Sequence, residues 1–125
     1  MRFCLRPGAV NQDMATRLGY CLATGIESVQ ESSAAVPGFV EKRQLDPAEL
    51  QAFVRHYTDA GVAVESMSLG QITPEVVLGK PEGQEDFERA CRDLKTLAEA
   101  GITIAGSGLP IDRQPTAEAK REQLK

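Results

Sequence analysis

Apolar residues at helical spacing, followed by a small residue, a glycine and a short β-branched segment, occur three times in this 125-residue chain. The three glycines are Gly25, Gly61 and Gly101. Glycine at such a point ends a helix in a left-handed conformation and lets the chain turn into a strand. This regular alternation predicts a parallel sheet covered by helices.

The same pattern places the individual elements. Strands are expected at residues 2–6, 26–30, 62–67 and 102–105, and helices at about residues 12–24, 47–60 and 84–100. Asn11 is a candidate N-cap of the first helix, and Asp46, Pro47 and Glu49 form the clearest helix start in the chain. Two long connections, residues 31–45 and 68–83, each follow a strand, whereas the returns from helix to strand are short. In parallel α/β proteins the loops after the strands build the functional site.

About four strand–helix units fit into residues 1–110, and a closed eight-fold barrel needs roughly 250 residues. The predicted fold class is therefore α/β, with four βα units of a TIM-barrel-like fold. Such a half barrel has a parallel sheet covered by helices. Residues 111–125 are expected to be a polar tail or the start of a truncated helix. An open flavodoxin-like sheet is the alternative architecture.

Composition restricts the class of protein further. A net charge of −4 with mixed signs offers no basic face for nucleic acid and no attraction to an anionic membrane. Cys4, Cys21 and Cys91 show no Cys-x-x-Cys spacing and are expected to be reduced core residues. No signal peptide and no apolar run of membrane-spanning length is present in the sequence, so a cytoplasmic location is predicted.

Alternation along the strands predicts which side chains face away from the helices. Those side chains would line the interior of a barrel. In the third strand, Ala63, Glu65 and Met67 are expected to face away from the helices, and Val62 and Val64 to face them. In the fourth strand, Thr103 and Ala105 are expected to face away from the helices, and Ile102 and Ile104 to face them.

Four polar residues at strand ends are the candidate substrate-binding set: Arg6, Glu31, Glu65 and Ser107. Because neighbouring strands lie about 4.8 Å apart, Arg6, Glu31 and Glu65 could form one polar cluster. An arginine can bind a carboxylate or phosphate, and glutamates can act as acid or base or bind sugar hydroxyls. For Glu31 a purely structural ion pair is an equally good interpretation. The catalytic residues remain unknown.

The only histidine, His56, falls on the outer face of the second helix, and no cysteine or carboxylate stands near it at ligand spacing. A transition-metal site within this chain is therefore not expected.

Residues 78–88, which read Leu-Gly-Lys-Pro-Glu-Gly-Gln-Glu-Asp-Phe-Glu, resemble a loop that enters a helix in the mannonate dehydratases. Val64-Glu65-Ser66 and Leu5-Arg6 are similar to strand ends of that family. More broadly the chain resembles the xylose-isomerase-like barrels. It departs from the dehydratases where Pro7 replaces a tryptophan and where Gly106-Ser107 replace a Tyr-Asn pair.

The resemblance implies the amino-terminal part of a metal-dependent sugar-acid dehydratase, a lyase of carbohydrate metabolism that is inactive alone. The family's metal ligands come from the second half of its barrel, so a divalent metal such as manganese is implied for a complete barrel and none for this chain. The implied ligand is a sugar acid or related small polyol, with Arg6 and Glu65 near it. The implied partner is a second copy or a complementary half-barrel. The alternatives are a non-catalytic binding or assembly module and a sugar isomerase or epimerase-like protein.

Overall fold

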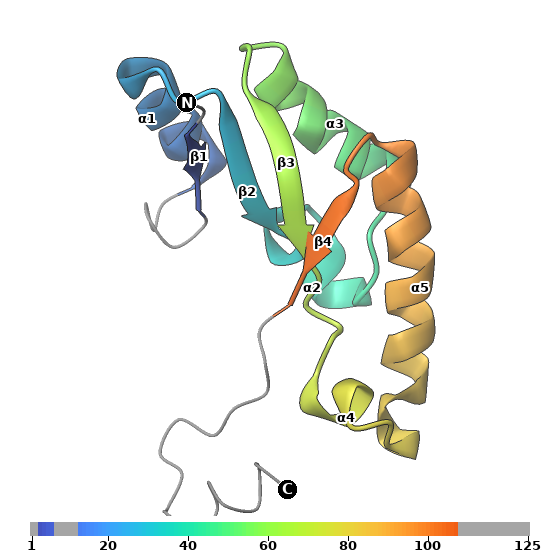
Figure 1. Cartoon of the computed structure of the whole chain (residues 1–125). Coiled ribbons are helices and arrows are strands. Elements are labelled where there is room, and N and C mark those ends of the chain that lie inside the picture. Colours follow the sequence, from blue (N-terminus) through green and yellow to red (C-terminus); the bar gives the residue numbers. More distant parts are fainter. Residues whose placement is uncertain (1–2, 7–12, 108–125) are drawn as a thin grey trace, which may run out of the picture.

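A four-stranded parallel sheet forms the centre of the protein (Figure 1). The computed structural model describes residues 3–6 and 13–107. The strands are β1 (Cys4–Leu5), β2 (Ser28–Ser32), β3 (Ala63–Ser68) and β4 (Ile104–Gly106), and they lie in the order β1-β2-β3-β4. Every neighbouring pair is parallel. The predicted α/β class with a parallel sheet is confirmed.

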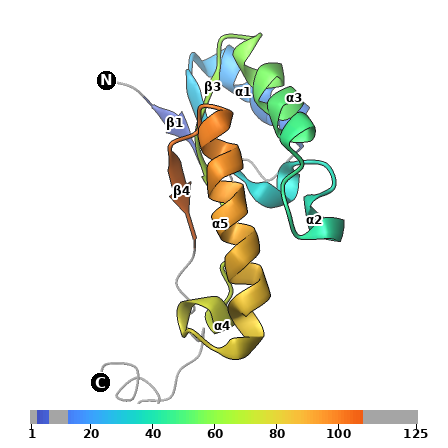
Figure 2. The ribbon, with the colours of Figure 1, turned by 90° about the vertical axis from the view of Figure 1, so that its right-hand side faces the viewer.

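The three long helices all cover one face of this sheet (Figure 2). They are α1 (Met14–Thr24), α3 (Pro47–Thr58) and α5 (Gln84–Glu99). Short helices occupy the two long connections: α2 (Phe39–Lys42) with the 3₁₀ turn η1 (Ser33–Ala35), and α4 (Pro74–Val77) with the 3₁₀ turn η2 (Pro81–Gly83). Within the described part of the chain, the opposite face of the sheet carries no helix; we call it the uncovered face.

The ends of the helices follow local chemistry. The Asp46 side chain accepts hydrogen bonds from the backbone amides of Ala48 and Glu49, as the predicted cap of α3 requires. Gly61 has φ +84°, a left-handed conformation that an L-residue adopts only at a cost, and it turns the chain into β3. Helix α1 begins with Asp13 as its N-cap. The predicted cap Asn11 lies outside the described residues.

Between the sheet and the helices lies one apolar core. Its largest buried side chains include Leu50 and Phe53 from α3, Leu97 from α5 and Met67 from β3. Val29, at the centre of β2, is fully buried. The core consists mainly of aliphatic residues, which agrees with the low aromatic content of the sequence.

A bulge in β3 changes the direction of the side chains that follow it. Val29 pairs with Val64, but Gln30 pairs with Ser66, so Glu65 is an extra residue on β3. Val64 and Met67 are therefore both buried, at 8% and 1% exposure. The prediction that Met67 points away from the helices is wrong because simple alternation fails across the bulge.

Other predictions on burial also need correction. Ile104, expected to face the helices, is 54% exposed and pairs with Ser66, which belongs to the uncovered face. On α5 the apolar residues that recur at helical spacing in the sequence are only partly buried, since Phe87 and Leu94 are about half exposed. Cys91 is exposed and is not a core residue, whereas Cys21 is buried as predicted.

Residues 111–125, predicted as a tail or truncated helix, lie outside the described residues. No helix in the described ranges has the length and apolar character needed to cross a membrane.

Candidate functional site

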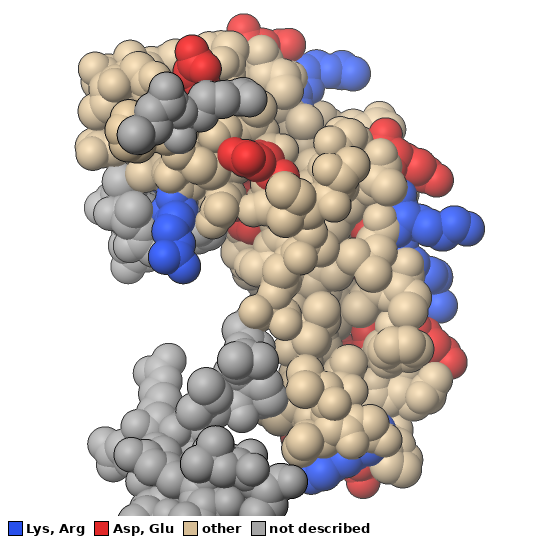
Figure 3. All heavy atoms as spheres, viewed as in Figure 1, with Lys and Arg blue, Asp and Glu red and all other residues tan. Residues whose placement is uncertain are grey.

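An open groove of about 400 Å³ lies on the uncovered face, at the carboxyl ends of the strands. This is the edge where parallel α/β proteins build their sites. Figure 3 shows the face that contains it. Polar side chains from the ends of all four strands border the groove: Arg6, Gln30, Ser66, Ser68 and Ser107. The apolar Ile104 and Met67 and the backbone of Gly106 also line it.

Strand register explains why these residues meet. Gln30, Ser66 and Ile104 stand at one level across β2, β3 and β4. Arg6 directly follows β1, and Ser107 directly follows β4. Three of the four predicted site residues, Arg6, Glu31 and Ser107, therefore border one groove, with Arg6 and Ser107 at its opposite ends.

Glu31 borders the same groove, but its carboxylate is 1% exposed and its partners come from the helix layer. It accepts hydrogen bonds from Arg17 Nε at 2.8 Å and from an Arg17 terminal nitrogen at 3.0 Å. It also accepts one from the Tyr57 hydroxyl at 2.6 Å. Glu31 thus forms a structural ion pair, and its cationic partner is Arg17 of α1 and not Arg6.

Tyr57 completes this buried group from α3. Burial raises the pKa of the Tyr57 phenol above its ordinary value of 10.0, and its hydrogen bond to the Glu31 carboxylate raises it further. The phenol therefore remains a hydrogen-bond donor at neutral pH and is unsuited to act as a base. Its edge-on contact with Phe53, at 5.7 Å between ring centres, fixes its orientation in the core.

Glu65 also lies on the uncovered face, where it is exposed and where Ser28 donates a hydrogen bond to its carboxylate at 3.1 Å. Cys4 of β1 belongs to the same group. Burial raises the pKa of the Cys4 thiol, and the Glu65 carboxylate adds to this effect. A neutral thiol is a poor nucleophile, so this arrangement does not favour covalent catalysis by Cys4. Glu31 and Glu65 bind different partners and do not share the expected cluster with Arg6.

A second buried carboxylate, which the sequence interpretation missed, is Asp93 on α5. It accepts hydrogen bonds from the Leu45 amide at 3.1 Å and from the side chains of Gln44 and Gln71. These residues belong to the two long connections after β2 and β3, so Asp93 fastens both connections to one helix. Its spacing between Ala90 and Leu97 on the apolar side of α5 was the signal that could have revealed it.

The loop that resembles the mannonate dehydratases folds as the turn η2 and the start of α5, next to α4. Gly79 adopts φ +68°. A Cβ at Gly83 would approach the Val76 backbone nitrogen to 2.6 Å, so glycine allows η2 to pack against α4. A small cavity of about 190 Å³ lies here, between Val76, Lys80 and Phe87.

Of the described side chains that line the groove, one is a carboxylate, that of Glu31, and none is a histidine or a cysteine. Within the described ranges, no group of three or more histidine, cysteine, aspartate or glutamate side chains is placed to hold an ion. The polar side chains that line the groove provide one guanidinium, one amide, several hydroxyls and the carboxylate of Glu31, which is already paired with Arg17. Such groups bind carboxylates and hydroxyls through hydrogen bonds. His56 is exposed on α3, as predicted.

Comparison with known proteins adds no assignment. No protein-family model, no curated protein and no solved structure matches this chain.

Proposed function

We propose that this chain is half of a β/α barrel and that its groove binds a sugar acid or a related small polyol. The observation that carries the proposal is the position and chemistry of the groove. It lies at the carboxyl ends of consecutive parallel strands and combines one arginine with hydroxyl and amide side chains. A guanidinium suits the carboxylate of a sugar acid, and the serine and glutamine side chains suit its hydroxyl groups.

Two features of the fold support the half-barrel interpretation over an open doubly wound sheet. Its strands follow one another in chain order without a reversal. The three long helices cover only one face, whereas doubly wound sheets carry helices on both faces. The resemblance of residues 78–88 to the mannonate dehydratases points to the same class of barrel.

The groove favours binding over catalysis by this half. Its described side chains do not fit a divalent metal, and Tyr57 and Cys4 are both held in neutral forms by raised pKa values. The metal-dependent loss of water would therefore belong to a complete barrel of the dehydratase class. A non-catalytic sugar-binding module is the second candidate. The hydrogen-bonding side chains that line the groove favour it as well.

Titration with gluconate, followed by NMR of the backbone amides, tests the proposal. Shifts are expected at Gln30, Ser66 and Ser107. Replacing Arg6 with alanine should weaken gluconate binding about fivefold, which corresponds to about 1 kcal/mol for an exposed ionic contact. Mannitol, which lacks the carboxylate, should bind the protein and the variant equally.

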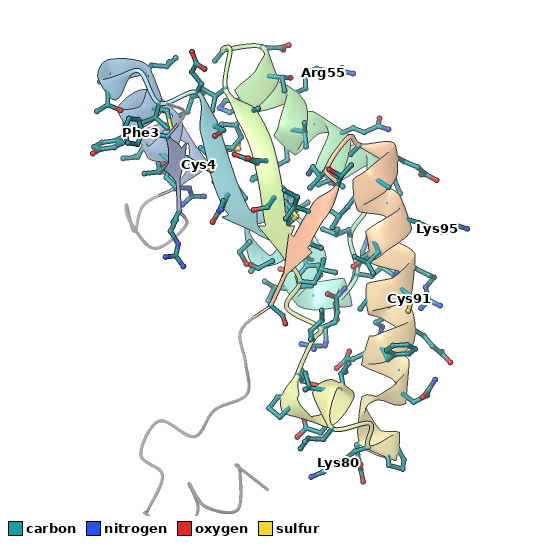
Figure 4. The ribbon with its side chains drawn as sticks, viewed as in Figure 1. Phe3, Cys4, Arg55, Lys80, Cys91 and Lys95 are labelled. Carbon is teal, nitrogen blue, oxygen red and sulfur yellow. The ribbon has the colours of Figure 1, made fainter. Side chains whose placement is uncertain are left out.

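Arg55→Ala is the matched control, because Arg55 is an exposed arginine on α3, on the helix-covered side (Figure 4). This variant should bind gluconate as the unaltered protein does. A dissociation constant in the millimolar range is assumed for gluconate. The proposal is wrong if gluconate at about ten times this concentration shifts no backbone amide resonance of the groove. It is also wrong if Arg6→Ala and Arg55→Ala weaken gluconate binding equally.

A further inference from the structure

The two edges of the sheet are unpaired within the described residues. β1 and β4 are the outermost strands of the order β1-β2-β3-β4, and each pairs with only one neighbour. An edge strand presents a row of backbone donors and acceptors that can pair with another strand. Figure 1 shows β1 and β4 at the two sides of the sheet, pointing in the same direction.

The uncovered face is also unusual for a parallel sheet. Parallel sheets occur almost only where both faces are covered. Here the uncovered face carries the open groove and the 54% exposed side chain of Ile104. None of the described helices covers this face, and the opposite wall of a barrel would cover it while leaving the groove accessible from one end.

Exposed apolar side chains concentrate on the two edge units. Nine large hydrophobic residues are exposed in the described part of the chain. Three of them belong to the β1–α1 edge and three to the α5–β4 edge, whereas the central helix α3 has none. The six edge residues are Phe3, Tyr20, Leu22, Phe87, Leu94 and Ile104. In a closed barrel these are the positions that the next βα unit would cover.

Helix α1 adds an independent observation. Its only charged residue, Arg17, is buried in the ion pair with Glu31. The exposed surface of α1 therefore carries no charge, whereas a helix that faces water normally has a charged or polar outer face. In Figure 3 charged side chains gather on the α5 side of the molecule. An uncharged outer surface at a sheet edge is typical of an interface.

A second copy of this chain satisfies all of these features together. The edge of β4 can pair with a further parallel strand, and the chain presents such a strand at β1, next to the uncharged outer surface of α1. A two-fold axis along the strands would form the β4–β1 contact twice and leave no free edge. Two copies of four strands provide the eight strands of a closed barrel, and closed two-fold symmetry is the commonest form of soluble oligomer.

We propose that two copies of this chain close into an eight-stranded barrel through pairing of β4 with β1 of the partner. The inference rests on the half-barrel architecture of the proposed function. It places Arg6 of the partner subunit beside Ser107, so that each groove becomes complete only in the dimer.

Light scattering coupled to gel filtration tests this proposal across a dilution series. The full chain should have twice its 13.5 kDa mass. Phe3→Glu at the β1 edge and Leu94→Glu on α5 should each raise the dissociation constant about tenfold or more, as expected for buried interface anchors. Val40→Glu is the matched control, since Val40 on α2 is as exposed as Phe3, both at 65%, and lies outside the edge units. It should leave the dimer unchanged.

Two further measurements separate barrel closure from other associations. Amides of β1 and β4 should exchange with solvent more slowly in the dimer than in the Phe3→Glu variant. A tandem fusion of two copies through a flexible linker should have the mass of one fused chain, because both seams would close within it. The proposal would be overturned if the full chain were a folded monomer, or if the β1 and β4 amides exchanged equally fast in the full chain and in the Phe3→Glu variant. It would also be overturned if the fusion formed larger multimers.

The gluconate titration distinguishes failure of this inference from failure of the proposed function. A dimer with protected edges that binds no gluconate keeps the closed barrel and refutes sugar-acid binding. A monomer that binds gluconate at Arg6 keeps the binding function and refutes closure by a second copy.

Discussion

Replacing Arg17 with methionine removes the cationic partner of the buried Glu31 carboxylate. Arg17 provides two of the three hydrogen bonds that this carboxylate accepts, at 2.8 and 3.0 Å, and the third comes from Tyr57. Both charged side chains are nearly inaccessible, at 11% and 1% exposure. Methionine retains much of the length of the arginine side chain, so the main loss is charge and hydrogen bonding.

Removing one partner of a buried ion pair costs about 3–5 kcal/mol, because the remaining charge stays buried without compensation. Domains of this size have unfolding free energies of about 5–15 kcal/mol, so the variant should be only marginally stable. The loss should be much smaller if the whole polar group is replaced. The triple variant Arg17→Met, Glu31→Leu, Tyr57→Phe leaves no unpaired polar atom from these three side chains.

Urea unfolding followed by circular dichroism measures the difference. The triple variant should be at least about 2 kcal/mol more stable than Arg17→Met, because replacement of a buried ion pair by apolar residues is often close to neutral. Arg43→Met is the control, since Arg43 is 43% exposed in its pair with Asp86 and should cost no more than about 1 kcal/mol. The reasoning is refuted if Arg17→Met costs no more than the control, or if the triple variant is no more stable than the single one.

Three other substitutions, at Tyr57, Gly83 and Gly19, should have smaller effects on stability. The pKa of Tyr57 is raised in the folded state above its unfolded value near 10.0, so the folded state holds the phenol proton more tightly. The free energy of unfolding should therefore fall above about pH 10, by up to about 1.4 kcal/mol per pH unit. Tyr57→Phe should lose less stability than the unaltered protein between about pH 10 and 12, measured by urea unfolding at each pH. Gly83→Ala should destabilise by about 1–3 kcal/mol, because its Cβ would meet the Val76 and Glu75 backbone. Gly19→Ala in α1, where a Cβ meets nothing within 4 Å, should stabilise by about 0.5–1 kcal/mol; equal thermal shifts in the two glycine variants would contradict this explanation.

Local signals in the sequence predict most of the fold. The cap at Asp46, the left-handed glycines and the β-branched segments act within a few residues, and the structure places α3 and β3 within one or two residues of the predicted bounds. The class and the parallel sheet follow from the alternation of these elements. The bulge at Glu65 does not follow, because it depends on how β3 pairs with β2, a contact between segments far apart in the sequence. It is the bulge that turns Met67 into the core.

The difference between local and long-range signals also determines which residues of the candidate site could be predicted. Arg6 and Ser107 border the same groove because each stands directly after a strand, a relation visible in the sequence. Glu31 also stands at a strand end, but it lies two residues after the core residue Val29 and so faces the helices. Its pairing with Arg17 depends on the rotation of α1 against the sheet. No pattern in β2 alone specifies that rotation.

On both long edge helices a charged residue occupies a core position, and apolar residues on the same helix stay exposed. On α1 the face toward the core contains Arg17 and Cys21, while the apolar Leu22 is 57% exposed. On α5 the buried residues are Ala90, Asp93 and Leu97, and the more apolar flank stays half exposed. In each helix a charged residue takes a core position because a buried partner on another segment compensates it. The exposed apolar residues lie on the outer flanks of the two edge units, and the proposed closure of the barrel would bury apolar area at these positions.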